Sequence, residues 1–121
     1  MGMRGIRGAA TVESDTKEEI WRTAQKLIKE IVEKNKIEAE QIGAMIFSST
    51  EDLKSAFPTA GVRQLPEFAL VPLFDTRQIA VEDSLTKCIR VLILAETDKN
   101  QKEICHVYLG GAKKLRPDLI S

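Results

Sequence analysis

The sequence predicts one α/β domain, in the broad sense of that class, with one long helix, one shorter helix and five strands. Residues 17–34 carry apolar side chains at helical spacing, and five other segments have the composition of strands. The chain of 121 residues has room for one core of normal size. No repeat, low-complexity stretch or shift in composition marks a linker, so residues 1–121 are expected to form a single domain.

The N-terminal segment is expected to be a strand, followed by the long helix. A period of two over residues 3–12 gives two faces, one with Met3, Gly5, Arg7 and Ala9 and the other with Arg4, Ile6, Gly8 and Ala10. Thr16 and Glu19 then form a capping box, which predicts a helix from about Lys17 to Lys34.

The middle of the chain predicts a strand, a short helix and a further strand. Residues 44–48 are an apolar run that ends in turn-forming residues. Pro58 suits the first turn of a helix, which should stop before Pro66. Residues 68–74 form the next predicted strand, and Pro72 implies either a sheet edge or an irregular ladder because proline lacks the N–H that a neighbouring strand needs.

The C-terminal part predicts a loop and two strands. Residues 75–83 are expected to form a loop, which carries several charged and polar residues. Residues 88–95 are apolar on both faces except for Arg90, which is typical of a central strand covered on both sides. A last short strand is expected over residues 104–109, and Gly110–Gly111 ends it.

Composition excludes several classes of protein. The 18 basic and 18 acidic residues cancel, which argues against a nucleic acid or an anionic membrane as partner. No apolar run is long enough for a membrane helix, and the N-terminus lacks the features of a signal peptide, so a cytoplasmic location is expected. Cys88 and Cys105 have no CxxC spacing, and with His106 as the single histidine no metal site is expected.

Two arginines on predicted strands are the sharpest chemical signals. Arg90 lies in an apolar strand, so it either binds an anion or reaches solvent or an internal carboxylate. Arg7 lies in another strand, where Gly5 and Gly8 leave room for a ligand or another part of the backbone. Guanidinium groups suit carboxylates, so the pair suggests a dicarboxylate ligand, and two unrelated surface arginines are the alternative.

Tyr108 is a third candidate, either as a ligand for a carboxylate or as a core residue with its hydroxyl at the boundary. No pairing of nucleophile and base, no phosphate-binding glycine loop and no carboxylate pair is recognisable in the chain. A catalyst made of these residues would work by binding and charge.

Motifs along nearly the whole chain resemble the AroH class of chorismate mutases. They are Arg4–Ala9 (RGIRGA), Thr11–Glu13, Phe57–Pro58, Val62–Arg63, Val71–Pro72, Cys88–Val91 (CIRV), His106–Leu109 (HVYL) and Leu115–Leu119 (LRPDL). The resemblance implies an α+β fold with a mixed sheet and helices packed on one face. It also implies a homotrimer with a barrel-like β core and active sites between subunits.

The implied reaction is the Claisen rearrangement of chorismate to prephenate, on the route to phenylalanine and tyrosine. This reaction needs no acid, base, nucleophile or cofactor, and the two carboxylates of chorismate agree with the arginines. The resemblance makes Arg90 the cation beside the ether oxygen, and it makes Arg7 and Tyr108 ligands of a carboxylate. It also implies a set of pocket residues: Phe57, Arg63, Leu73, Phe74 and Leu115, with Arg116 on a mobile C-terminal lid of about residues 112–121.

The sequence departs from the family pattern in the loop that should complete the site. The family usually has cysteine at Asp75 and a glutamate, which accepts a hydrogen bond from the substrate hydroxyl, at Gln78. We expect Asp75 to take over the charge-balancing role and Gln78 to keep a neutral hydrogen bond, which makes them catalytic partners of Arg90. A family lysine is replaced by Ala60 and a small residue by Thr59, which should shift KM without loss of the reaction.

The sequence is also compatible with two other functions. The unusual Asp75 and Gln78 allow a non-catalytic, carboxylate-binding or regulatory trimer. A trimeric imine or enamine deaminase of similar architecture also uses arginine to hold a carboxylate, although the HVYL and LRPDL segments fit the mutase better.

Overall fold

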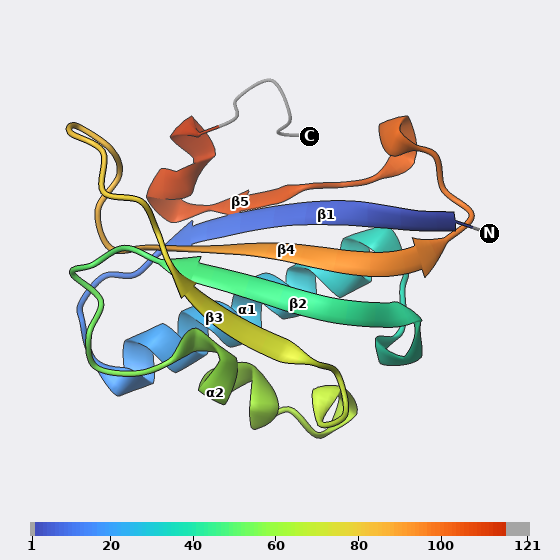
Figure 1. The fold of residues 1–121 in the computed structure, drawn as a ribbon, viewed down its shortest axis with the longest axis horizontal. Coiled ribbons are helices and arrows are strands. Elements are labelled where there is room, and N and C mark those ends of the chain that lie inside the picture. Colours follow the sequence, from blue (N-terminus) through green and yellow to red (C-terminus); the bar gives the residue numbers. More distant parts are fainter. Residues whose placement is uncertain (1, 116–121) are drawn as a thin grey trace.

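Five strands and two α-helices occupy residues 2–115, which are the residues that the computed structural model describes (Figure 1). In chain order they are β1 (Gly2–Thr11), α1 (Lys17–Asn35), β2 (Ile42–Ser49), α2 (Pro58–Arg63), β3 (Leu73–Arg77), β4 (Cys88–Thr97) and β5 (Val107–Leu109). Short 3-10 turns η1 to η4 cover Ala39–Gln41, Pro66–Phe68, Gln101–Glu103 and Gly110–Lys114. The order of helices and strands is the predicted one.

The strands of residues 2–115 form one mixed sheet in the order β3-β2-β4-β1-β5. Strand β4 is antiparallel to both of its neighbours, whereas β1 pairs with β5 and β2 pairs with β3 in parallel. The expected mixed sheet, the central place of β4 and the edge place of β3 are confirmed. No helix in this part of the chain is long and apolar enough to cross a bilayer.

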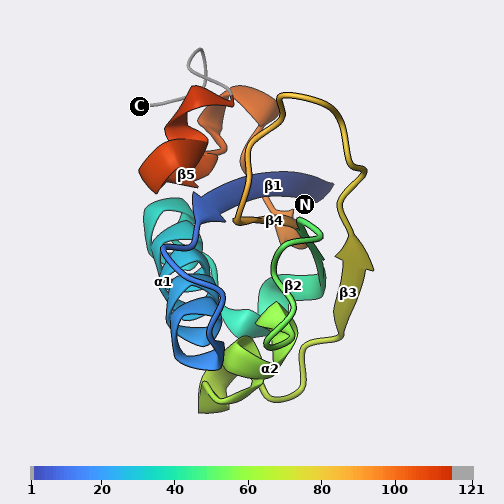
Figure 2. The same ribbon diagram turned by 90° about the vertical axis from the view of Figure 1, so that its left-hand side faces the viewer.

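Helix α1 forms where the capping box predicts it. The Thr16 hydroxyl accepts the N–H of Glu19 at 3.2 Å, and Lys36 ends the helix with a left-handed φ of 52°. Its apolar stripe is fully buried and consists of Ile20, Ala24, Leu27, Ile28 and Ile31. Figure 2 shows α1 beside the curved sheet.

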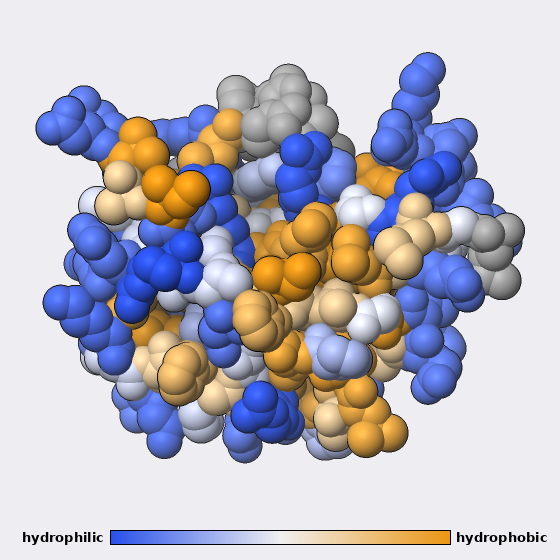
Figure 3. Space-filling model, viewed as in Figure 1, coloured by the Kyte–Doolittle hydropathy of each residue, from blue (hydrophilic) through white to orange (hydrophobic). Residues whose placement is uncertain are grey.

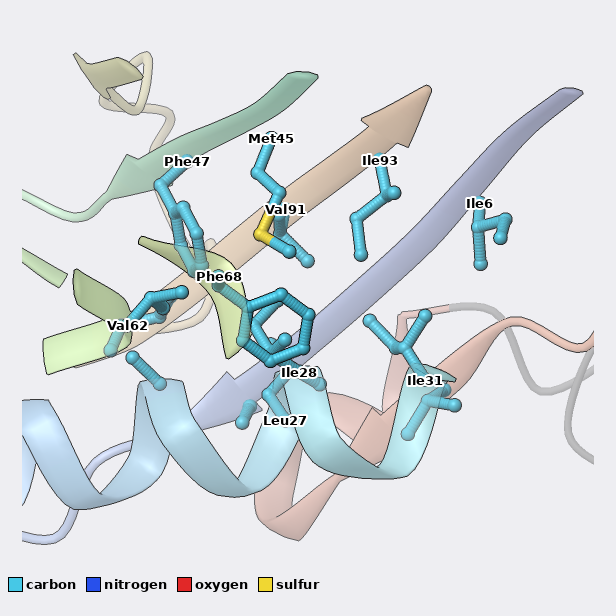
Figure 4. Packing of buried hydrophobic residues seen from close by; sticks show 14 of the residues in the cluster. Ile6, Leu27, Ile28, Ile31, Met45, Phe47, Val62, Phe68, Val91 and Ile93 are labelled. Carbon is cyan, nitrogen blue, oxygen red and sulfur yellow. The ribbon is translucent and has the colours of Figure 1, made fainter. Parts of the chain in front are cut away.

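The core lies between this stripe and one face of the sheet. Figure 4 shows Ile28 and Ile31 of α1 across from Phe47 and Val91 of the sheet, with Val62 of α2 in the same cluster. Both helices therefore pack on the same face, as expected. Burial of these apolar side chains is the main favourable term in folding.

Asp15 joins the start of α1 to the loop before α2. Its Oδ1 accepts the backbone N–H groups of Lys54 at 2.9 Å and of Ser55 at 3.0 Å. The pKa of Asp15 lies below its ordinary value of 3.8: partial desolvation raises it, but the hydrogen bonds from Lys54 and Ser55 lower it more. The ionised carboxylate is thus the form that stabilises this junction.

We expect Asp15→Asn to lower the Tm at about pH 7 and to lose this effect at low pH. Because the folded-state pKa is lowered, the stabilising contribution is present above the unfolded value and is lost as the pH falls through the folded value. Thermal unfolding of the wild-type protein and of Asp15→Asn at about pH 7 and about pH 3 measures the difference in Tm. An equal difference in Tm at both pH values would contradict this role of the ionised form.

The strand predicted over residues 68–74 is wrong in its bounds. Residues 66–68 form the turn η2, and Phe68 turns its side chain into the core at 3% exposure. The strand begins at Leu73 and continues to Arg77, within the predicted loop, because it pairs residue by residue with β2. That pairing is a long-range contact which the local run of apolar residues does not reveal.

Strand β4 is central but is not covered on both faces within one chain. From Val91 to Ala95 its burial alternates, and Leu92 remains 38% exposed. The last strand is also shorter than predicted, because the turn η3 precedes it and pairing with β1 begins only at Val107.

The face of the sheet away from α1, here called the open face, is apolar at its centre. The predicted alternation in β1 is confirmed, since Ile6 is buried on the α1 side and Met3 is 66% exposed on the other. Phe74 is 64% exposed on the same face as Leu92. Figure 3 shows the resulting group of hydrophobic residues over the middle of this face.

Candidate active site

The register of the strands places the strongest candidates on the open face. Arg90 of β4 lies directly between Ser48 of β2 and Ala9 of β1, and Tyr108 of β5 lies next to Ala9. Arg7 lies two residues before Ala9 and therefore on the same face. The pairing of strands from the two ends of the chain thus brings Arg7, Arg90 and Tyr108 together.

These side chains share a cavity of about 230 Å³, here called the arginine pocket. It is lined by Arg7, Gly8, Ala9, Arg90, Val91, Tyr108 and Leu115. Two cations and a phenol around one cavity match a ligand with carboxylate groups.

The Arg90 guanidinium has unused hydrogen-bonding capacity. Its Nε is buried and has no hydrogen-bond partner among the described residues. Buried polar atoms are nearly always paired, so an orphaned donor on a cation points to an anionic or oxygen-rich partner from outside. No carboxylate of the described residues is hydrogen-bonded to Nε, so the alternative of an internal carboxylate partner is not observed at this atom.

Cys88 lies beside Arg90 and does not neutralise it. The thiol is free and buried, at 1% exposure. Burial raises the pKa of Cys88, although the neighbouring charge of Arg90 acts to lower it. The thiol is therefore neutral near pH 7, and the positive charge of Arg90 remains available to a ligand.

Tyr108 combines the two roles considered for it. The residue is 8% exposed and packs in a small cluster with Ala9, Cys88 and Ala112. Leu115 packs against the same cluster, and both Tyr108 and Leu115 line the arginine pocket. The ring is therefore held by the core, which fixes its position at the pocket wall.

Arg7 is exposed, and its backbone is held by a histidine. The N–H of Arg7 donates to Nδ1 of His106 at 2.9 Å, which extends the pairing of β1 with the chain just before β5. No pattern in the sequence predicts this contact. Gly8 makes room for α1 and not for a ligand, because a Cβ there would lie 2.6 Å from Cδ1 of Ile31. Gly5 faces the open side, where Leu92 is its neighbour.

Asp75 belongs to a different cavity. A space of about 560 Å³, here called the aspartate pocket, is lined by Phe57, Pro58, Asp75 and neighbouring residues. Asp75 pairs with Phe47 in β2, which puts its side chain on the face that carries the helices. Within one chain, Asp75 and Arg90 therefore lie on opposite faces of the sheet.

Gln78 lies on the side of Arg90. Its Oε1 accepts a hydrogen bond from the Ser48 hydroxyl at 3.0 Å, and Ser48 is the β2 residue directly opposite Arg90. The backbone N–H of Gln78 also donates to the carbonyl of Ser49 at 2.9 Å. The neutral amide is thus anchored next to the arginine, and Ser48 is a contact that the sequence did not predict.

Three other predicted residues, Arg63, Leu73 and Phe74, line neither of these two pockets within one chain. Phe74 is on the open face, whereas Leu73 is half-buried toward the helices. Arg63 is exposed at the end of α2. Arg116 lies outside the described residues, as does most of the predicted lid. No three His, Cys, Asp or Glu side chains within residues 2–115 are placed to hold a metal ion.

Comparison with known proteins gives one consistent answer. Residues 3–119 match the family model "Chorismate mutase type I". The chorismate mutase AroH of Bacillus subtilis is 44% identical over 119 residues, which cover 98% of this chain and 94% of that protein. The one from Thermus thermophilus is 48% identical over 120 residues, which cover 98% of each.

The fold agrees with this result. A solved chorismate mutase from Clostridium thermocellum superposes with a TM-score of 0.89 at 45% identity, and the match covers 92% of this chain and 98% of that one. The chain therefore belongs to the type I chorismate mutases, the isomerases that convert chorismate to prephenate.

Proposed function

We propose that chorismate rearranges in the arginine pocket and that Arg90 is the main catalytic group. The observation that carries this proposal is the buried, unpaired Nε of Arg90 in a cavity that Arg7 and Tyr108 also line. The pocket offers a donor whose hydrogen bond is free for the substrate.

The chemistry needs a fixed cation and little else. As the ether bond lengthens and the new carbon–carbon bond forms, negative charge grows on the ether oxygen. A guanidinium held by β4 stabilises this oxygen more in the transition state than in the ground state. A preorganised donor of this kind contributes about 3 to 4 kcal/mol, which is on the order of a hundredfold or more in rate.

Arg7 and Tyr108 bind a carboxylate of the substrate in this proposal. Arg7 is exposed at the rim and Tyr108 is held in the wall, so together they orient the ligand against Arg90. Holding the compact diaxial form of a flexible substrate lowers the barrier by orientation. The walls for this form come from Phe57, Arg63, Leu73, Phe74 and Leu115.

A second copy of the chain completes the site. The arginine pocket and the aspartate pocket lie on different faces of one sheet, so residues from both meet only between two chains. The open face exposes Met3, Phe74 and Leu92, an apolar area that a copy of the chain would cover. These features support the homotrimer with a barrel-like β core that the family resemblance implies.

The acid and the amide then have separate roles. Asp75 of one chain accepts the hydrogen bond of the substrate hydroxyl and balances Arg90 of its neighbour. Gln78 lies in the same chain as Arg90, next to Ser48, and supplies a neutral hydrogen bond. A carboxylate close to a guanidinium is a strong interaction where water is excluded.

The proposed setting is the biosynthesis of phenylalanine and tyrosine in the cytoplasm. The free thiols of Cys88 and Cys105 fit a reducing compartment. Because the relatives are named as chorismate mutases, neither a non-catalytic trimer nor an imine deaminase is favoured. The match of residues 3–119 to one family supports a single domain.

Mixing two inactive variants tests the shared site. Arg90→Ala removes the cation, and Asp75→Lys places a positive charge where the acid is needed. If the two residues come from different chains, random mixing in a trimer restores about one quarter of the sites. The variants are co-expressed, and the rate of chorismate loss is compared with that of each variant alone.

The matched control mixes Arg90→Ala with Arg7→Ala. Both residues line the arginine pocket of one chain, so no site in the mixture has both, and no activity should return. If the mixture of Arg90→Ala with Asp75→Lys is inactive although mass spectrometry shows mixed trimers, the whole site lies within one chain. That result would overturn the proposal.

A further inference from the structure

We infer that Thr59 is a positioning residue that fixes the carboxylate of Asp75 for the substrate hydroxyl, an inference that rests on the role of Asp75 proposed above. Thr59 is on α2 and Asp75 is on β3, and they contact each other through two hydrogen bonds. Thr59 does not line the aspartate pocket and acts only through the acid.

The two hydrogen bonds hold both oxygens of the carboxylate. The Thr59 hydroxyl donates to Oδ2 of Asp75, and the Thr59 backbone N–H lies 3.4 Å from Oδ1. Two donors on two oxygens set the plane of the carboxylate as well as its position. A single donor would leave the group free to rotate.

The start of α2 needs this acceptor. Helices begin with backbone N–H groups that have no partner inside the helix, and a side chain just before the helix usually accepts one of them. Phe57 occupies that position and makes no capping hydrogen bond, and Pro58 follows it. Asp75 comes from β3 to accept the N–H that Phe57 cannot serve.

The hydrogen-bond donor Thr59 is held rigidly, whereas the acceptor Asp75 is not. Thr59 is 3% exposed and packed between helix and sheet, so its hydroxyl stays in place. Asp75 is half-buried on β3, which is an edge strand of the sheet. Packing alone therefore leaves the Asp75 side chain with rotational freedom, and the contact with Thr59 removes it before the substrate binds.

Lone pairs remain on Asp75 for a ligand. An ionised carboxylate offers about four acceptor sites, and the two contacts with Thr59 occupy about half of them. Asp75 lines the same cavity as Phe57, so in the proposed complex a hydroxyl donor of the substrate takes one of the remaining sites. By holding Asp75 in this orientation, Thr59 favours a ligand that places a hydrogen-bond donor, either a hydroxyl or a cation, at this end of the site.

Removing the hydroxyl while keeping the shape tests the inference. We expect Thr59→Val to lower kcat/KM by about tenfold to a hundredfold, because a hydrogen bond to a charged group is lost. Thr59→Ser keeps the hydroxyl and should retain most of the activity. Gln64→Ala at the exposed end of α2 is the control and should equal wild type. Thr59→Ala replaces Thr59→Val if the larger apolar side chain prevents folding.

The decisive comparison combines Thr59→Val with Asp75→Asn. If Thr59 acts through Asp75, the double variant has the kcat/KM of Asp75→Asn alone. A further drop equal to that of Thr59→Val, or wild-type kcat/KM for Thr59→Val, overturns the inference while Asp75 keeps its proposed role. Wild-type activity of Asp75→Asn overturns that role and this inference together. Thermal unfolding of every variant separates these outcomes from loss of the fold.

Discussion

Arg90→Ala is expected to lower kcat by more than about a hundredfold with little change in the Tm. The guanidinium is half-buried in β4, and its Nε has no hydrogen-bond partner among the described residues. In the proposed mechanism this cation serves the ether oxygen of the substrate. Its loss removes a contact that strengthens as the reaction proceeds, so the effect falls on kcat more than on KM. Steady-state rates at saturating chorismate measure it.

Two other arginine variants serve as comparisons for Arg90→Ala. Arg90→Lys keeps a positive charge but not the planar donor, so it should retain only part of the rate. Arg22→Ala, on the exposed side of α1 beside Glu19, changes an arginine far from the site and should leave the rate unchanged. A kcat for Arg90→Ala within about tenfold of wild type would remove Arg90 from the centre of the mechanism.

Leu92→Asp is expected to abolish both assembly and activity. Leu92 lies at the centre of the open face and is 38% exposed in a single chain. In the proposed trimer a carboxylate there would be buried without a partner, which costs about 3 to 5 kcal/mol at each contact. Sedimentation should show a folded monomer, and the rate of prephenate formation should fall to the spontaneous level.

The matched control places the same charge elsewhere. Leu70 is 96% exposed and lies between η2 and β3, so Leu70→Asp should leave the trimer and its activity intact. If Leu92→Asp remained a fully active trimer, the open face would not be the surface that joins the chains.

Local signals account for the parts of the fold that were predicted well. Helix α1 needs only the N-cap hydrogen bond at Thr16 and the stripe that begins at Ile20, and both act within a few residues. Strand β3 shows the opposite case. Its bounds depend on pairing with β2, and the turn at Pro66 occupies part of the predicted strand.

The sequence predicts a set of candidate site residues but not their arrangement. Strand period and residue type single out Arg7 and Arg90, but only the register of β1, β4 and β5 shows that they share a pocket with Tyr108. The contact of Asp75 with Thr59 joins residues of β3 and α2. Such contacts depend on tertiary packing, to which neither periodicity nor spacing is sensitive.

The most direct test of the shared site is a crystal structure with a bound dicarboxylate analogue of the transition state. We predict that Arg90 of one chain contacts the ether oxygen of the analogue while Arg7 and Tyr108 of that chain hold a carboxylate. The hydroxyl should face Asp75 of a neighbouring chain. An analogue bound within a single chain, or one that Arg90 does not contact, would contradict the proposed mechanism.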